Sequence, residues 1–163
     1  LRDEIAAVTG GNAVSADTVN KLPTVSRVLK EVMRLYPPAP VMTRFNAVEV
    51  EMVGNVLPSP TLIVMPIFII HRHRVLWDDP NRFDPDRFLP EREARYPRTQ
   101  FMPFGFGQRI CIGSSFATLE ATAILATLLQ KARFEWDGKV APEPVSRVTL
   151  RPKGGMPLIV RSL

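Results

Sequence analysis

The sequence predicts a mainly α fold with small β-sheets, an α+β arrangement, from two helical patterns and several short strand-like runs. Apolar residues recur at helical spacing over residues 24–36, and residues 114–131 are apolar on nearly every side. Residues 48–53 alternate between apolar and polar, which is typical of a strand with one wet face. The 163 residues fit one domain or part of one, and 16 prolines disfavour further long helices.

Residues 1–10 predict the end of a helix that Gly10 and Gly11 close. The chain starts at Leu1 without a basic-then-apolar leader pattern, so an internal or truncated start is expected. No membrane segment is predicted within the chain. Whether a membrane anchor lies upstream stays open, and the localisation depends on it. The localisation would be cytoplasmic if the missing N-terminus has no anchor.

Residues 24–36 predict the first long helix, with Thr24 as its cap after Pro23. Pro37 and Pro38 end it, because proline cannot continue a helix. Its predicted apolar stripe consists of Val25, Val28, Leu29, Val32 and Tyr36.

Residues 47–70 predict β hairpins, in which strand 48–53 pairs with a buried strand over 61–65. Gly54, Asn55 and residues 58–60 supply the turns. The apolar run that follows ends in two histidines, His71 and His73, which we interpret as surface or strand-end residues.

Residues 77–103 predict an irregular meander with many prolines, in which Trp77 serves packing. A glycine-rich cysteine loop follows at 104–113, and then the helix 114–131, which is apolar all round and therefore expected to be buried. The tail predicts a C-terminal hairpin over 147–161, formed by strands at its two ends.

Charge is unevenly distributed between the two halves of the chain. Residues 1–81 hold 8 Lys+Arg and 8 Asp+Glu, whereas residues 82–163 hold 13 and 8, so the net charge of +5 lies in the second half. The excess suggests an acidic partner or an anionic ligand, or simply a solvated surface. No Lys/Arg cluster is dense enough to predict nucleic-acid binding.

Cys111 is the single cysteine, which excludes an internal disulfide. It lies just before the apolar helix and two residues after Arg109, among Gly105, Gly107 and Gly113. A helix N-terminus and nearby positive charge favour a thiolate, and glycines let a ligand approach the backbone. The loop therefore indicates a sulfur presented to a large, flat, apolar partner, with a buried structural cysteine as the alternative.

Spacing argues against two other uses of this loop. A dinucleotide fingerprint needs a glycine where Ile110 stands, and a phosphate-binding cysteine loop needs an arginine where Ala117 stands. A cysteine-dependent hydrolase stays open, because histidines about 40 residues upstream could still meet Cys111 in space.

The cysteine loop resembles a known family motif. Residues 104–113 read F-G-F-G-Q-R-I-C-I-G and resemble the haem-binding loop of the cytochrome P-450 family, F-G-x-G-x-R-x-C-x-G, at every fixed position. Ala117 and Glu120 match the A-x-x-E that usually follows. The resemblance covers essentially the whole chain and implies the C-terminal portion of that fold, within one haem-thiolate domain.

The resemblance also implies roles for four residues around haem b (iron protoporphyrin IX). Cys111 would be the axial thiolate ligand of the haem iron, and Phe104 would shield its sulfur. Arg109 and Arg44 would each pair with a haem propionate, a charge-assisted contact that suits a guanidinium.

Two further segments resemble the family. Glu31 and Arg34 form an E-x-x-R pair, which alone would indicate only a wet helix face. Residues 83–88 (F-D-P-D-R-F) resemble the family's F-x-P-E-R-F, with Asp86 in place of the usual Glu. The resemblance implies that Glu31, Arg34 and Arg87 form a buried charge network.

The resemblance implies a haem-thiolate monooxygenase as the parent protein. Such an enzyme inserts one oxygen atom from O₂ into a small organic substrate with electrons from a ferredoxin, a flavodoxin or a reductase. No catalytic residue is expected within residues 1–163, because the oxygen-activating helix is missing. The alternatives are a non-catalytic truncated fragment and a cysteine-dependent hydrolase.

Overall fold

The fold is described by a computed structural model of residues 1–163. The helices and helical turns are, in chain order, α1 (Arg2–Thr9), α2 (Ala16–Val19), α3 (Pro23–Leu35), α4 (Ile67–Ile70), η1 (Pro85–Phe88), α5 (Pro90–Glu93), η2 (Gly107–Arg109) and α6 (Ser114–Lys131). The strands are β1 (Met42–Phe45), β2 (Val50–Met52), β3 (Asn55–Leu57), β4 (Leu62–Met65), β5 (Ala132–Trp136), β6 (Pro144–Ser146), β7 (Leu150–Pro152) and β8 (Leu158–Ser162). The strands form separate two-stranded sheets, so the predicted mainly α fold with small β-sheets is confirmed.

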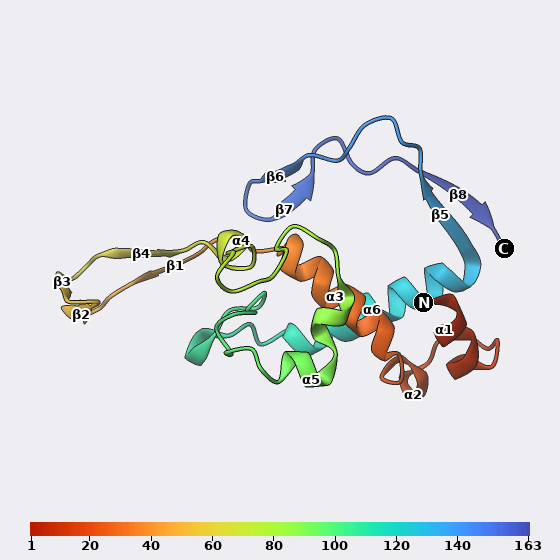
Figure 1. The fold of residues 1–163 in the computed structure, drawn as a ribbon, viewed down its shortest axis with the longest axis horizontal. Helices are drawn as coiled ribbons and strands as arrows, with labels where there is room; N and C mark the ends of the chain where they lie inside the picture. Colours follow the sequence, from red (N-terminus) through yellow and green to blue (C-terminus); the bar gives the residue numbers. More distant parts are fainter.

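Helices α3 and α6 lie at the centre of the molecule, and α1 and α2 pack against α6 (Figure 1). Four buried side chains form the core between them: Ile5, Leu22, Val25 and Ala126. This core covers only the first half of α3, because Val32 and Tyr36, farther along the predicted stripe, are exposed by 40% and 52%.

The start of α3 is fixed by a carboxylate from α1. Pro23 takes the first helical position, where its missing N–H costs nothing. The prediction that Thr24 caps the helix is wrong, because the backbone N–H groups of Thr24 and Val25 donate to the Glu4 carboxylate at 2.8 and 3.1 Å. Burial acts to raise the pKa of Glu4, but the hydrogen bonds from Thr24 and Val25 outweigh it and lower the pKa below its usual value.

The strands β1 to β4 form a long arm that projects from the body (Figure 1). The prediction that residues 48–53 pair with 61–65 is wrong, because β2 pairs with β3 and β4 pairs with β1. A turn at Val53 and Gly54 folds β2 straight back onto β3, which leaves β4 to the earlier strand. The expected burial of 61–65 is also wrong, since two of its side chains, Leu62 and Val64, are exposed by 49% and 53%.

The meander contains the short helical pieces η1 and α5, and η1 packs against α3. Trp77 is buried, in agreement with its predicted packing role. Its ring centroid lies 5.1 Å from that of Tyr96 and 6.3 Å from that of Phe88. These rings hold the meander beside the end of α3.

The C-terminal segment forms an open arch over the central helices (Figure 1). The predicted hairpin over 147–161 is wrong, because β7 pairs with β6 and β8 pairs with β5. Strand β5 follows α6 without a loop and offers β8 a partner, and the N–H of Leu163 donates to the carbonyl of Lys131 at 3.3 Å. Residues 147–149 form the turn between β6 and β7 instead of a strand.

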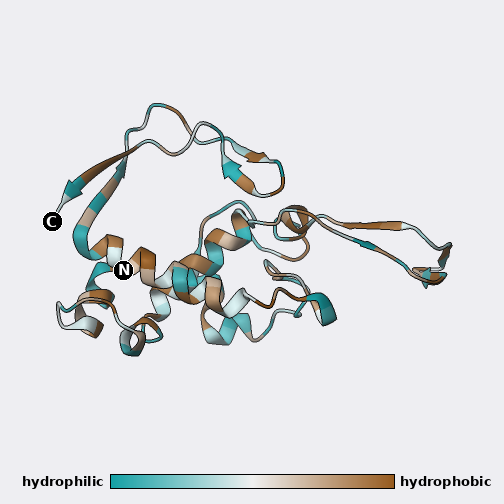
Figure 2. Cartoon of the chain, turned by 180° about the vertical axis from the view of Figure 1, so that it is seen from behind, coloured by the Kyte–Doolittle hydropathy of each residue, from teal (hydrophilic) through white to brown (hydrophobic).

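Much of the apolar surface of α6 is exposed. Hydrophobic segments run along the central helices and the arm (Figure 2). Only Thr122 and Ala126 of α6 are buried, whereas Phe116, Ile124 and Leu128 are exposed by 69%, 53% and 47%. The prediction of a buried helix is therefore wrong within residues 1–163. None of the helices combines the length and hydropathy needed to cross a membrane.

Candidate functional site

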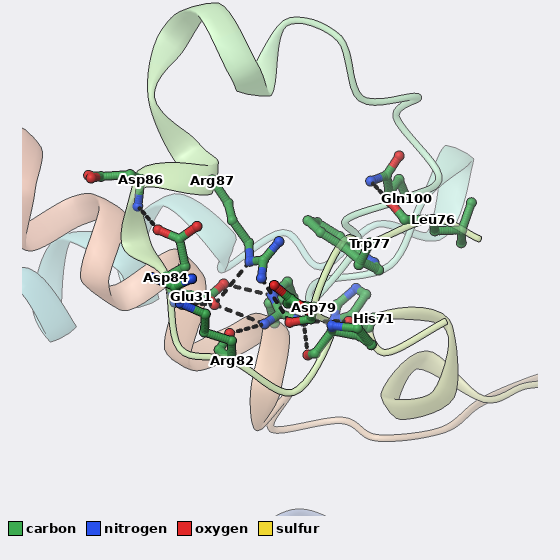
Figure 3. A network of polar contacts seen from close by, with 12 residues as sticks. Glu31, His71, Leu76, Trp77, Asp79, Arg82, Asp84, Asp86, Arg87 and Gln100 are labelled. Atoms are coloured by element: carbon green, nitrogen blue, oxygen red, sulfur yellow. Dashed lines mark hydrogen bonds and ion pairs between the residues drawn. The ribbon is translucent and has the colours of Figure 1, made fainter. Parts of the chain in front are cut away.

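A buried ion-pair network joins α3 to the meander (Figure 3). The Arg34 guanidinium donates to both carboxylate oxygens of Glu31, at 2.6 and 2.8 Å, and Arg87 Nε lies 3.5 Å from the same carboxylate. The side chains of Glu31 and Arg34 have no exposed surface, and that of Arg87 is 3% exposed. The structure thus brings these three residues together, and a wet helix face is the wrong interpretation of Glu31 and Arg34.

Backbone groups complete this network. The backbone N–H of Asp84 donates to Glu31 at 2.8 Å and helps to stabilise the negative charge of the carboxylate. Three carbonyl oxygens accept hydrogen bonds from Arg34: those of His71 at 2.8 Å, Pro80 at 2.7 Å and Arg82 at 3.1 Å. Because two arginines face one carboxylate, these carbonyl dipoles solvate the surplus positive charge in a site without water access.

His71 belongs to the same buried region, which corrects its prediction as a surface or strand-end residue. It has no exposed surface, and its Nε2 accepts a hydrogen bond from the backbone N–H of Met102 at 3.0 Å. Burial lowers its pKa from 6.5 to about 4, so the imidazole is neutral at neutral pH. His73, by contrast, is exposed as predicted, and its Nδ1 accepts a hydrogen bond from the N–H of Val75 at 3.3 Å.

The sequence carries one signal for a buried polar group at the end of α3. Pro37 and Pro38 have no N–H groups, so the carbonyls of Met33 and Arg34 lack their partners within α3. Such carbonyls favour a polar neighbour, but the local sequence does not show which residue packs there.

The cysteine loop presents the Cys111 side chain on the surface. The backbone N–H of Cys111 donates to the carbonyl of Phe104 at 2.9 Å, which closes the loop on itself. Gly105 has φ +83°, and a Cβ there would come within 3.2 Å of Met42. Helix α6 begins at Ser114, so Cys111 stands three residues before the start of a long helix.

Several residues close to Cys111 in the sequence have exposed apolar side chains. Phe106, Ile110 and Ile112 are exposed by 52%, 50% and 103%, as is Phe116 by 69% in the first turn of α6. Four exposed apolar side chains within eleven residues mark a surface that a partner or ligand covers. Phe104 is half-buried and lines a hollow of 710 Å³ between α3 and α6.

The two arginines predicted to hold propionates are both exposed. Neither has a carboxylate within ion-pair distance. Arg44 Nη1 donates to the carbonyl of Thr43 at 2.8 Å. Met42 touches the cysteine loop at Gly105, and Arg44 lies two residues farther along β1, on the same face of the strand. Arg109 ends the turn η2 inside the loop.

This set of residues limits what the site can bind. No group of three His, Cys, Asp or Glu side chains that could hold a bare metal ion is present. The geometry does not favour a cysteine-dependent hydrolase, because His71 is buried with its Nε2 engaged by Met102.

Comparison with known proteins agrees with this description. A family model for cytochrome P-450 matches residues 1–159. The structure superposes on the crystal structure of cytochrome P450DA heme domain with a TM-score of 0.91 and 28% identity, covering 99% of this chain and 36% of that one.

Curated relatives come from plants and bacteria. Cytochrome P-450 72A11 of Arabidopsis thaliana is 38% identical over 99% of this chain and 32% of its own length. Pentalenene oxygenase of Streptomyces avermitilis is 39% identical over 92% of this chain and 33% of its own length. The chain thus spans about a third of these relatives, and its motifs, its fold and its sequence together show that it belongs to the cytochrome P-450 family.

Proposed function

We propose that this chain is the haem-binding part of a haem-thiolate monooxygenase, which inserts one oxygen atom from O₂ into an organic substrate. The observation that carries the proposal is the exposed sulfur of Cys111 at the start of α6, inside a loop that matches the family motif at every fixed position. Pentalenene oxygenase, a relative of similar identity, supports the oxygenase class. The relatives do not share one substrate name, so the substrate is left as a small organic molecule.

The residues of the loop fit haem b. Cys111 offers one soft ligand, Phe106 and Ile112 offer apolar surface, and Arg109 and Arg44 offer two cations without carboxylate partners. We infer that Cys111 holds the iron, that Arg109 and Arg44 bind the propionates and that Phe104 shields the sulfur. Haem bound in this way supplies oxygen activation, to which the thiolate contributes by donating electron density to the iron.

The chain's own part in the reaction is to hold the sulfur in place. The hydrogen bond from Cys111 N–H to the Phe104 carbonyl fixes the backbone on both sides of the loop. The network of Glu31, Arg34 and Arg87 holds the meander, which leads into the loop, against α3. We assign it a structural role, without contact to the reacting atoms.

A carbon monoxide difference spectrum of the full-length protein tests this proposal. Cys111→Ser should abolish the thiolate-type spectrum of the reduced protein, because an alcohol does not replace a thiolate as an iron ligand. Ser115→Ala is the matched control, since Ser115 is exposed and lies four residues downstream, and it should leave the spectrum unchanged. A thiolate-type spectrum that survives Cys111→Ser would refute the ligand assignment.

We also infer that an acidic electron donor, such as a ferredoxin, a flavodoxin or a reductase domain, docks against the basic half of the chain. Residues 82–163, which include the cysteine loop, carry 13 Lys+Arg against 8 Asp+Glu. Attraction between unlike charges is screened by salt, with a Debye length of about 8 Å at 0.15 M. The rate of electron transfer should therefore fall as ionic strength rises, and a rate independent of salt would contradict this docking.

A further inference from the structure

His71 connects two parts of the site that the family motifs leave separate. Its backbone carbonyl accepts a hydrogen bond from Arg34 at 2.8 Å, so it is tied to the ion-pair network. Its side-chain Nε2 accepts a hydrogen bond from the N–H of Met102 at 3.0 Å, so it is also tied to the segment that enters the cysteine loop. The neighbouring ring of Phe101 lies 5.3 Å from the imidazole, centroid to centroid, and helps to fix its plane.

Two more backbone hydrogen bonds lead from Met102 to the cysteine. The N–H of Gly105 donates to the Met102 carbonyl at 3.0 Å, and the N–H of Cys111 donates to the Phe104 carbonyl at 2.9 Å. Gly105 is held between them, with Met42 pressed against it. A displacement of Met102 would thus be passed to Cys111 through a short stretch of hydrogen-bonded backbone.

The hydrogen bond from Met102 assigns the tautomer of His71. Because Nε2 accepts this hydrogen bond, it carries a lone pair and no proton. The proton of the neutral ring therefore sits on Nδ1. Backbone carbonyls of Met33 and Arg34, at the end of α3, face the imidazole, and the prolines at 37 and 38 leave both without a helical donor. Nδ1 makes no hydrogen bond to a protein group, so the hydrogen bonds that tie His71 to Arg34 and Met102 run through its carbonyl and its Nε2.

The charges that face His71 keep it neutral. The guanidinium of Arg34 in α3 and that of Arg72, the next residue, both oppose a positive imidazole, and burial opposes it more strongly. A neutral ring is the form that can accept the Met102 hydrogen bond, because the protonated ring has no lone pair.

We propose that His71 is a positioning residue for Cys111: its carbonyl accepts from Arg34 in α3 and its Nε2 accepts from Met102, so it joins the end of α3 to the cysteine loop and sets where the sulfur stands. The effect on the haem rests on the proposed function, whereas the effect on the loop does not. His71 touches neither the sulfur nor any reacting atom, so it acts only through the backbone between Met102 and Cys111.

Three variants of the full-length protein separate the two ends of this connection. In His71→Gln the side-chain carbonyl can reach the place of Nε2 and accept from Met102. In His71→Asn the shorter amide keeps a donor near the place of Nδ1 but offers no acceptor to Met102. His73→Asn is the matched control, because His73 is the exposed histidine two residues away.

Amide hydrogen exchange at Met102, measured in the haem-free protein, reports the loop directly. The loss of one hydrogen bond should speed exchange by about tenfold in His71→Asn. His71→Gln and His73→Asn should stay within about twofold of the wild type. The carbon monoxide difference spectrum of the haem-loaded protein should show a several-fold loss of the thiolate-type form in His71→Asn alone.

The outcomes are distinct from those of the proposed function. Equal Met102 exchange in His71→Asn and His73→Asn would overturn the positioning role, as would a His71→Gln protein that behaves like His71→Asn. Should His71→Asn not fold, His71→Gln decides: a retained thiolate-type spectrum supports the role, and its loss overturns it. A wild type without any thiolate-type spectrum would sink the proposed function, while Met102 exchange would still decide the role of His71.

Discussion

Glu31 is a single charged residue with no exposed surface, and three groups donate to it or pair with it. Its carboxylate binds the Arg34 guanidinium through two oxygens, pairs with Arg87 and accepts from the N–H of Asp84. Lys30 and Glu93 form a contact of similar length, 2.7 Å, but their side chains are 31% and 36% exposed. Burial, and not distance, therefore separates these two ion pairs in their effect on stability.

Glu31→Gln should destabilise the full-length protein far more than Glu93→Gln. Neutralising Glu31 strands two buried guanidinium groups, which costs roughly 3 kcal/mol or more. Glu93→Gln should cost less than about 1 kcal/mol, because water screens and replaces an exposed pair. Free energies of unfolding from denaturant titration check this difference, and equal losses in the two variants would contradict the buried-network description.

His71 should make stability fall in mild acid. Burial, with Arg34 and Arg72 nearby, lowers its pKa from 6.5 to about 4 in the folded protein. Between these two pH values the unfolded chain binds a proton that the folded chain refuses, so acid favours unfolding. The contribution of His71 is thus fully present above pH 6.5 and is lost as the pH falls to about 4.

Comparison of the wild type with His71→Gln isolates this contribution, because glutamine does not titrate. Relative to His71→Gln, the wild type should lose about 3 kcal/mol of unfolding free energy between pH 7 and pH 4. Above pH 7 the difference between the two proteins should be flat. A difference that does not change between pH 7 and pH 4 would show that His71 is protonated as easily in the folded protein as in the unfolded one.

The cysteine loop is the element in which local sequence says most about structure. Its glycines, its cysteine and the helix that follows are adjacent in the chain, so their spacing is also their geometry. Helix α6 spans the residues that the apolar pattern delimits, Ser114–Lys131. The exposed faces of α6 could not be predicted in this way, since they depend on which elements lie opposite.

Two glycines of this loop should differ in their tolerance of alanine. Gly105 and Gly107 both have positive φ, +83° and +75°, so alanine at either pays about 1–2 kcal/mol of backbone strain. Gly105→Ala also drives its Cβ against Met42 at 3.2 Å, whereas nothing lies within 4 Å of a Cβ at Gly107. Gly105→Ala should therefore lower haem retention and unfolding free energy more than Gly107→Ala.

A second substitution tests the cause of that difference. In a Met42→Ala background the added cost of Gly105→Ala should shrink to that of Gly107→Ala, because the opposing side chain is gone. An unchanged cost in that background would assign the effect to the backbone alone. Haem content after gel filtration and unfolding free energies provide the two measurements.

The strands show where element-level prediction ends. Alternation marks a run such as 48–53 as a strand, but it says nothing about which strand lies beside it. The partner of β4 is β1, on the far side of the β2–β3 turn, and the partner of β8 is β5, directly after α6. Strand pairing is set by turn length and by distant segments, so it requires the three-dimensional structure.

At the scale of the whole molecule, residues 1–163 expose more surface than a compact protein of their size. The accessible surface is 11334 Å², and 21 of the 163 residues are buried. A compact globular protein of 18.3 kDa would expose roughly 8,100 Å². The surplus includes the apolar faces of α6 and of the arm, which are surfaces suited to packing against other parts of a larger fold.

Residues 1–163 expressed alone should bind an apolar fluorescent dye strongly and show no monooxygenase turnover. Dye binding follows from the exposed apolar faces, and the lack of turnover follows because the chain spans about a third of its relatives. The full-length protein is the control and should bind little dye and oxidise substrate with a suitable electron donor. Turnover by residues 1–163 alone would contradict the assignment of the oxygen-activating residues to another part of the protein.

The sequence alone identified the family, the mainly α fold with small sheets, the cysteine loop and the three charged residues of the network. Each of these rests on residues at fixed short spacing, or on motifs that the family keeps in the same order. The resemblance, more than periodicity, indicated burial of Glu31 and Arg34, since helical patterning alone placed them in water.

Only the tertiary structure decided the partners of β4 and β8, the cap that Glu4 provides and the place of His71. The physical reason is common to all of them. Whether a strand edge, a helix N-terminus or an imidazole is satisfied depends on a group tens of residues away, and local sequence does not specify what comes into contact with it. The sequence predicts His71 as a surface or strand-end residue. In the fold it is buried, and Met102, 31 residues later, donates a hydrogen bond to it.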